Sequence, residues 1–162
     1  MKETANLKKL DRDLLNLLQE SGRLSNAKIA EAVHLSETPC WRRIKKLEEA
    51  GFIDSYTALL NKKRLGFSFQ AIVSLCVSSH TRETTRNFEA TIAAYPEVLA
   101  FYNITGEYDF MVNVISENVD TYRIFMENSF RKLDCITKIS TSVILNRIKE
   151  TTKLPTKLPL QE

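Results

Sequence analysis

The hydrophobic pattern at the start of the chain is typical of short helices. In residues 10–20 the apolar positions recur at helical spacing, as expected for one buried face. Gly22 follows this segment, and glycine is a usual residue just past a helix end. Residues 26–33 have the same period, and Ser25 stands before them as a favourable N-cap. We therefore expect two helices before residue 34.

A third helix is expected over residues 36–50. Ser36 is a favourable N-cap, and Pro39 falls in the first turn, where its missing N–H does no harm. Gly51 follows the end of the helix. Only His34 and Leu35 separate this helix from the one before it, so the connection is a tight turn. A short helix, a tight turn and a longer helix form a helix-turn-helix.

The third helix has an apolar inner face and a basic outer face. The candidate DNA-binding residues on the outer face and its flanks are Ser36, Thr38, Trp41, Arg42, Arg43, Lys45 and Lys46. Arginine can bind guanine bidentately in the major groove, and lysine neutralises phosphate. The alternative is an ordinary solvated basic face. Trp41 could stack on a base or a sugar or pack over the second helix, and of these we favour packing. The two capped helices that precede this face favour DNA binding.

The hydrophobic period changes after the third helix. Residues 52–60 are β-prone and fit either a small wing or a linker strand. Residues 61–66 are polar and basic and end in a glycine, and the period alternates beyond them. We therefore expect a helix-turn-helix domain over residues 1–60, a linker over 61–66 and a second domain over 67–162.

The second domain has the pattern of a ferredoxin-like βαββαβ fold, which makes the chain α+β. The expected strands are residues 67–78, 98–105, 108–115 and 136–148, and the expected helices are residues 82–95 and 119–133. Gly106 and Glu107 lie between two strands as a hairpin signal. This plan places two helices on one face of a four-stranded antiparallel sheet.

Apolar residues occupy both alternating faces of the last two expected strands. One face carries Phe110, Val112, Val114, Ile139, Val143 and Leu145, and the other carries Met111, Ile115, Ile136, Ile144 and Ile148. The helices cover one face, and a bare apolar face needs a cover. The same face of a second copy is the simplest cover, so we expect a homodimer. Such a dimer would present two third helices to half-sites about one helical turn, ~34 Å, apart on double-stranded DNA.

Composition and charge exclude several other classes of protein. The first 64 residues hold 13 Lys/Arg against 9 Asp/Glu, and the remainder holds 10 against 11, so the positive excess lies beside the basic helix. The three cysteines are too far apart for a zinc site or a disulfide framework, and they favour a reducing compartment. No apolar run approaches the ~20 residues of a membrane span, and the polar start is unlike a signal peptide, so we expect a cytoplasmic protein.

No catalytic constellation is evident in the sequence. His34 and His80 are isolated from any triad or metal-ligand partner, and no phosphate-binding glycine loop is present. We expect no enzyme activity, no catalytic residue, no metal and no cofactor.

Three segments resemble the Lrp/AsnC (feast/famine) regulators. They are residues 35–53 around the helix-turn-helix, residues 56–61 after it, and residues 105–110 in the second domain. The resemblance implies a winged helix-turn-helix followed by a ligand-binding domain, and dimers that assemble further, commonly into octamers. It also implies an amino acid or a related small molecule as effector, bound near the turn between the second and third strands.

The resemblance implies an effector site at Gly106, Glu107, Tyr108, Asp109, Val119, Thr141 and Ser142. Asp109 or Glu107 suits an ammonium group, and the N–H groups around Gly106 with the Ser142 hydroxyl suit a carboxylate. The alternative is a plain hairpin glycine followed by a turn cap. On that interpretation the protein would be an effector-independent DNA-organising protein whose second domain serves only for assembly.

Overall fold

The computed structural model describes residues 7–78 and 81–156. Their contacts divide the chain into two compact units. We call the described parts of Met1–Leu59 and Lys149–Glu162 the helical unit, and Leu60–Ile148 the sheet unit. The segment after residue 148 therefore packs with the helices, although the sequence grouped it with the second domain. His80 lies outside the described residues.

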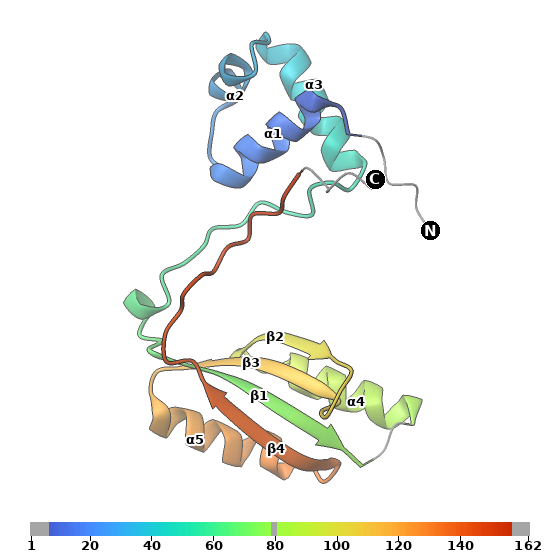
Figure 1. Ribbon diagram of the computed structural model, residues 1–162, viewed down its shortest axis with the longest axis vertical. Coiled ribbons are helices and arrows are strands. Elements are labelled where there is room, and N and C mark those ends of the chain that lie inside the picture. The colour runs from blue at the N-terminus through green and yellow to red at the C-terminus, as the bar shows by residue number, and fades with distance from the viewer. Residues whose placement is uncertain (1–6, 79–80, 157–162) are drawn as a thin grey trace. The chain divides into compact units, whose positions relative to one another are not determined.

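The helical unit contains three helices, α1 (Lys9–Glu20), α2 (Asn26–Ala32) and α3 (Glu37–Glu49), which pack around a small core (Figure 1). The buried apolar side chains of this core are Leu14, Ile29, Ala30, Cys40, Ile44 and Leu47. They come from the apolar faces that the helical period predicts. The three expected helices are therefore present.

The connection between α2 and α3 spans residues 33–36. His34 lies in it with a φ of 54°, a left-handed conformation that is uncommon for residues other than glycine. The Ser25 hydroxyl accepts a hydrogen bond from the Lys28 N–H (3.4 Å) and caps α2. Ser36 occupies the N-cap position of α3 without a side-chain cap bond, and its carbonyl accepts from the Cys40 N–H (3.3 Å).

Residues 52–60 form no strand, so the wing or linker strand expected there is absent. A β-prone segment becomes a strand only where a neighbour completes its backbone hydrogen bonds. A short 3-10 helix, η1 (Lys63–Leu65), follows and ends at Gly66, whose φ of 93° requires glycine.

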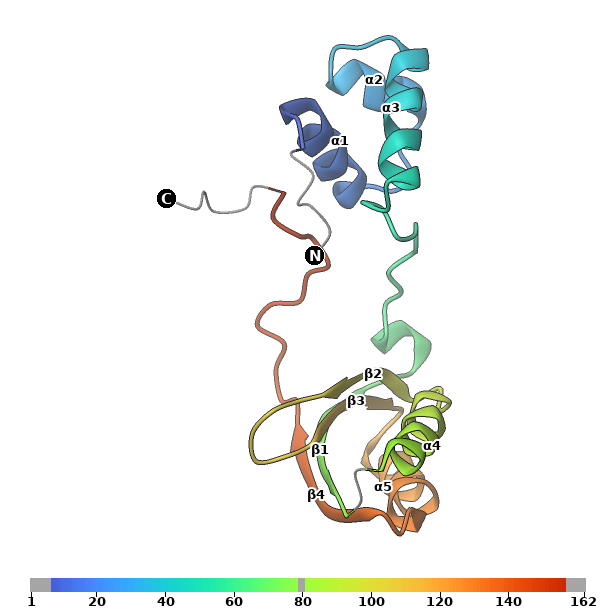
Figure 2. The same cartoon turned by 90° about the vertical axis from the view of Figure 1, so that its right-hand side faces the viewer.

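The sheet unit has the expected ferredoxin-like architecture. Its strands are β1 (Phe69–Val77), β2 (Val98–Asn103), β3 (Phe110–Ser116) and β4 (Ile136–Val143). They pair antiparallel in the order β2-β3-β1-β4. The helices α4 (Arg82–Ala93) and α5 (Val119–Asn128) both lie on one face of this sheet (Figure 2).

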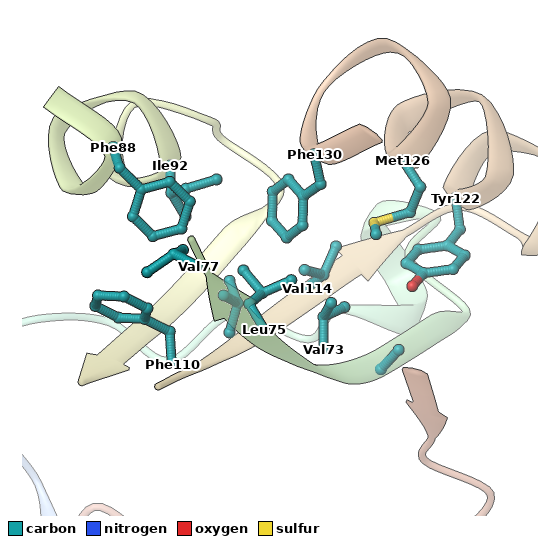
Figure 3. Close-up of a cluster of buried hydrophobic side chains, with 12 residues drawn as sticks. Val73, Leu75, Val77, Phe88, Ile92, Phe110, Val114, Tyr122, Met126 and Phe130 are labelled. Carbon is teal, nitrogen blue, oxygen red and sulfur yellow. The ribbon is translucent and has the colours of Figure 1, made fainter. Parts of the chain in front are cut away.

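The core of the sheet unit fills the space between the sheet and its two helices. Figure 3 shows Val73, Leu75 and Phe110 pointing from the strands toward Phe88 and Phe130. The side chains at alternate positions of β1 and β3 are almost completely buried on this face. This alternation gives the sheet one helix-covered face and one open face.

Two elements at the C-terminal end are shorter than the sequence predicts. The helix expected to reach residue 133 stops at Asn128, because Ser129 leaves the helical region and its hydroxyl bonds back to the Phe125 carbonyl (2.6 Å). A 3-10 turn, η2 (Phe130–Lys132), follows. The last strand ends at Val143, paired with Ala71, rather than at residue 148, and one further bond runs from the Ile144 N–H to the Gln70 carbonyl (2.9 Å).

The open face of the sheet is more polar than predicted. A register shift between Cys76 and Val77 makes Thr137 an extra residue in β4, so Ile136 and Ile139 both face the helices. The side chains that share the open face are Gln70, Ile72, Ser74, Cys76, Ala100, Tyr102, Met111, Asn113, Ile115, Lys138, Ser140 and Ser142. The expectation of an apolar open surface on β4 was therefore wrong, and the apolar side chains of the open face lie on β1, β2 and β3.

Candidate nucleic-acid interface and effector site

The outward face of α3 is an exposed basic surface of the helical unit. Ser36, Thr38, Trp41, Arg42, Lys45 and Lys46 are all exposed, as the helical period predicts. The opposite face holds Cys40, Ile44 and Leu47 in the core, so the orientation of α3 about its axis is fixed by packing. Burial raises the pKa of the Cys40 thiol, which suits a small core residue rather than a reactive thiolate.

Arg43 differs from the other basic residues of α3, because α1 holds it. Its Nε and Nη2 donate to the two carboxylate oxygens of Asp11, at 2.5 Å and 2.8 Å. The Asp11 side chain is 10% exposed and that of Arg43 is 32% exposed. The hydrogen bonds from Arg43 hold the pKa of Asp11 below its ordinary value of 3.8. Arg43 therefore joins α1 to α3 and is less exposed than Arg42 and Lys46.

Lys45 is also partly committed, in this case within α3. Its ammonium contacts the Glu48 carboxylate at 2.9 Å, and the Tyr56 hydroxyl donates to the other oxygen of Glu48 at 3.0 Å. Burial, with the Glu48 carboxylate beside it, raises the pKa of Tyr56 to about 12. The Tyr56 ring lies where a side chain at Gly22 would meet it, 3.6 Å from the position of a Cβ. Residues after α3 thus pack back onto the α1–α2 connection.

Arg42 and Lys46 are the basic residues of α3 that form no ion pair among the described residues. They lie four residues apart, so they project from one side of the helix about one turn apart. Trp41 stands beside them with 47% of its surface exposed.

The turn predicted to bind an effector carries a charged cluster at one end of the sheet. Gly106 has a φ of 130°, which a side chain at that position would not tolerate. The Lys138 ammonium contacts the Glu107 carboxylate at 2.6 Å and lies 4.7 Å from the centre of the Tyr108 ring. The hydrogen bond to Glu107 raises the pKa of Lys138. Carboxylate, ammonium and aromatic ring are thus grouped at an exposed position.

Asp109 has a structural role within this turn. Its Oδ2 accepts a hydrogen bond from the Val77 N–H (2.9 Å), at the point where the β1–β4 register shifts. The Asp109 N–H donates to the Leu75 carbonyl at 2.9 Å. One carboxylate oxygen of Asp109 is therefore engaged with the backbone.

The remaining predicted effector residues do not converge on this turn within one chain. Thr141 faces the helices, where its hydroxyl pairs with the Tyr122 hydroxyl (2.8 Å), whereas Ser142 lies on the open face. Val119 begins α5, beyond the far end of β3 from the turn. A seven-residue strand spans about 20 Å, which separates Val119 from Gly106.

Sequence reasoning missed two residues that organise these sites. Asp11 could have been found, because an acidic residue next to the apolar stripe of α1 is expected to be buried only if it is paired with a basic residue. Lys138 had no comparable signal, because its neighbour Thr137 is the extra residue in β4 and strict alternation fails there.

Residues 7–78 and 81–156 contain no group of three or more His, Cys, Asp or Glu side chains arranged to hold a metal ion. Among them there is also no helix with the length and apolar character needed to cross a membrane.

The sequence matches known families over both units. Residues 7–54 match the winged helix-turn-helix DNA-binding family, and residues 70–154 match the Lrp/AsnC ligand binding domain. The DNA-binding transcriptional activator DecR of Escherichia coli (strain K12) is 36% identical over 149 residues, 92% of this chain and 98% of DecR. The leucine-responsive regulatory protein of Salmonella typhimurium is 30% identical over 148 residues, 91% of this chain and 90% of that protein.

Solved structures give the same assignment. An AsnC family transcriptional regulator from Agrobacterium tumefaciens is 36% identical with a TM-score of 0.87, covering 92% of this chain and 97% of that one. A transcriptional regulator from Neisseria meningitidis, solved as a complex with L-Met, is 33% identical with a TM-score of 0.88, covering 92% and 96%.

A helix-turn-helix with an exposed basic helix, followed by a ligand-binding domain, defines a DNA-binding transcriptional regulator. The chain belongs to the Lrp/AsnC family, whose members are regulators and not enzymes.

Proposed function

We propose that this regulator binds specific double-stranded DNA through the outward face of α3, and that an amino acid or related small molecule adjusts its DNA binding or assembly. The observation that carries the DNA contact is the pair Arg42 and Lys46, exposed and uncommitted one turn apart. Arg42 is the candidate for reading a base, and Lys46 for neutralising phosphate. Ser36 and Thr38, at the N-terminal end of α3, suit contacts to a base or a phosphate.

Arg43 and Lys45 have supporting roles in this proposal. Arg43 fixes α3 on α1 through Asp11, and Lys45 must leave Glu48 before it can reach a phosphate. Lys45 and Glu48 form an exposed ion pair that contributes little stability, so DNA competes for this lysine at small cost. Trp41 is exposed enough to contact a sugar or a base.

We also propose a homodimer through the open face of the sheet. Ile72, Met111 and Tyr102 form its apolar centre, with the polar chain Asn113–Gln70–Arg147 beside them. A second copy of this face covers the apolar centre and lets polar side chains pair across a two-fold axis. Dimers assembling further, into octamers, remain the family-based expectation.

The effector proposal rests on the Glu107, Lys138 and Tyr108 cluster. A zwitterionic ligand would break the Glu107–Lys138 ion pair and form two new ones, with its ammonium at Glu107 and its carboxylate at Lys138. Because Val119, Thr141 and Ser142 lie elsewhere in the same chain, a site that used all of them would draw residues from more than one copy. The Neisseria meningitidis relative with bound L-Met supports an amino acid as the ligand class.

The alternative is an effector-independent DNA-organising protein. The scattering of the predicted effector residues within one chain favours it, because a hairpin glycine and a turn cap explain Gly106 and Asp109 without a ligand. The sequence of the turn is compatible with both functions.

The experiment that tests the proposed function is footprinting over the genome, repeated with each of the twenty amino acids. The proposal predicts discrete protected sites, and at least one amino acid that changes their occupancy. Thermal shift of the purified protein against the same amino acids provides the direct binding measurement. Discrete sites without any amino-acid effect in either assay would favour the organising protein, and the absence of discrete sites would refute a sequence-specific regulator.

A further inference from the structure

The C-terminal segment, residues 149–156, returns to the helical unit and contacts α1. The Gln19 side-chain amide makes two hydrogen bonds with the Leu154 backbone: its Nε2 donates to the carbonyl (3.1 Å), and its Oε1 accepts from the N–H (2.6 Å). A side-chain amide carries the same donor and acceptor as a peptide group. Gln19 therefore binds the segment as a neighbouring β-strand would.

Two further contacts flank this pair. The Thr156 hydroxyl donates to the Asn16 side-chain carbonyl at 3.0 Å, and the Lys153 ammonium lies 3.5 Å from the Glu20 carboxylate. Positions three and four residues apart share one face of a helix, so the three α1 residues form a continuous docking face. The Leu154 side chain is 74% exposed, so the docking uses backbone and polar groups rather than an apolar anchor.

The other face of α1 packs against the recognition helix. Asp11 holds Arg43 of α3, and Leu14 is fully buried in the core of the helical unit. The C-terminal segment and α3 thus contact the same helix on different sides. A change in how the C-terminal segment contacts α1 therefore acts on the helix that holds α3 in place.

We infer that residues 149–156 form a strap, a segment that docks on α1 and so links the end of the ligand-binding domain to the helical unit. It acts as a second tether between the two units, in addition to the linker that follows α3. The chain passes from the helical unit to the sheet unit between Leu59 and Leu60 and returns between Ile148 and Lys149. Two tethers restrict the orientations of the helical unit more than one tether does. The contacts are few and exposed, so the strap is releasable and its docking is reversible.

The test compares two substitutions at one position in the full-length protein. Leu154→Pro removes the N–H that Gln19 accepts, whereas Leu154→Ala keeps the backbone and changes a side chain that contributes little contact. The segment lies outside helices and strands, so proline does not interrupt an element of secondary structure. Chains ending after Thr156 and after Ile148 form a second matched pair, since only the shorter chain lacks the strap.

The first measurement is amide hydrogen exchange of Lys153, whose N–H donates to the Thr151 hydroxyl within the strap (3.1 Å) and is present in both Leu154 variants. In the wild type, in Leu154→Ala and in the chain ending after Thr156, exchange should be slowed about tenfold relative to Leu154→Pro, as expected for one ordinary hydrogen bond. Exchange at the rate of an unstructured peptide in the wild type, or equal rates in Leu154→Pro and Leu154→Ala, overturns the docking.

The second measurement is the time-resolved fluorescence anisotropy of Trp41, which is the only tryptophan and lies in α3. Release of the strap should shorten the slow decay in Leu154→Pro and in the chain ending after Ile148, but not in their two controls. Faster exchange without faster anisotropy decay overturns the tether. Neither readout depends on DNA or effector, so a failure here is distinguishable from a failure of the proposed function.

Discussion

The Asp11–Arg43 pair offers a direct test of how α3 is held. Asp11→Ala removes two charge-assisted hydrogen bonds to Arg43 and the bond that the carboxylate accepts from the Lys8 N–H (3.1 Å). Breaking a buried pair costs about 3–5 kcal/mol, and hydrogen bonds to charged groups contribute about 1.5–3 kcal/mol. Arg43 is one-third exposed and can be rehydrated, so we expect a loss of about 2 kcal/mol from the helical unit.

The assay is thermal unfolding followed by Trp41 fluorescence, which reports on α3 alone because the chain has one tryptophan. A loss of 1 kcal/mol lowers Tm by about 4–8 °C in a domain of 60–100 residues, so the expected shift is about 8–16 °C. Asp13→Ala is the control, since Asp13 is an exposed carboxylate of the same helix, and it corrects for helix propensity and helix dipole. A shift in Asp11→Ala within about 2 °C of that in Asp13→Ala would refute the reasoning.

Three further predictions concern pH and the effector turn. Arg43 lowers the pKa of Asp11 in the folded protein, so the ion pair stabilises the helical unit fully above the ordinary pKa of 3.8. This stabilisation is lost as pH falls through the lower pKa of the folded state. In Asp11→Asn, the Tm measured by Trp41 fluorescence should therefore fall less steeply with decreasing pH than in the wild type. Asp109→Ala should destabilise the sheet unit by about 1–3 kcal/mol in urea unfolding followed by far-ultraviolet circular dichroism, because the Val77 N–H loses its acceptor, whereas Asp109→Asn, which keeps an oxygen there, should not. Lys138→Met and Glu107→Gln should each abolish stabilisation by an amino-acid effector in thermal shift with little change in the ligand-free Tm, and retained stabilisation in both variants would move the effector away from this cluster.

Periodicity predicted the architecture well, because both cores follow regular patterns. The helical faces that contribute Leu14, Ile44 and Leu47 and the alternating β1 residues are evident in the sequence. The errors occur where a local event breaks the pattern. Thr137 is an extra residue in β4, Ser129 ends α5 early, and residues 52–60 find no strand partner.

The sites were less predictable than the fold, because side-chain partners come from distant parts of the chain. Arg42 and Arg43 are adjacent in the sequence, and only the fold shows that their roles differ, because Arg43 pairs with Asp11 on another helix. Lys138 approaches Glu107 across the sheet, and Leu154 reaches Gln19 from 135 positions away. None of these pairings has a periodicity from which it could be inferred.

The central claim is that DNA binds the outward face of α3 through Arg42, while Arg43 holds the helix in place. The most direct measurement is the affinity of wild type, Arg42→Ala and Arg43→Ala for a footprinted site over a range of salt concentrations. The account predicts that Arg42→Ala weakens binding by about 1–3 kcal/mol, with relaxed specificity if it reads a base, or with a salt slope smaller by about 1 if it contacts phosphate. In Arg43→Ala the salt slope should equal that of the wild type, with Tm lowered. Unchanged DNA affinity in Arg42→Ala, together with a reduced salt dependence of DNA binding in Arg43→Ala, would contradict the central claim.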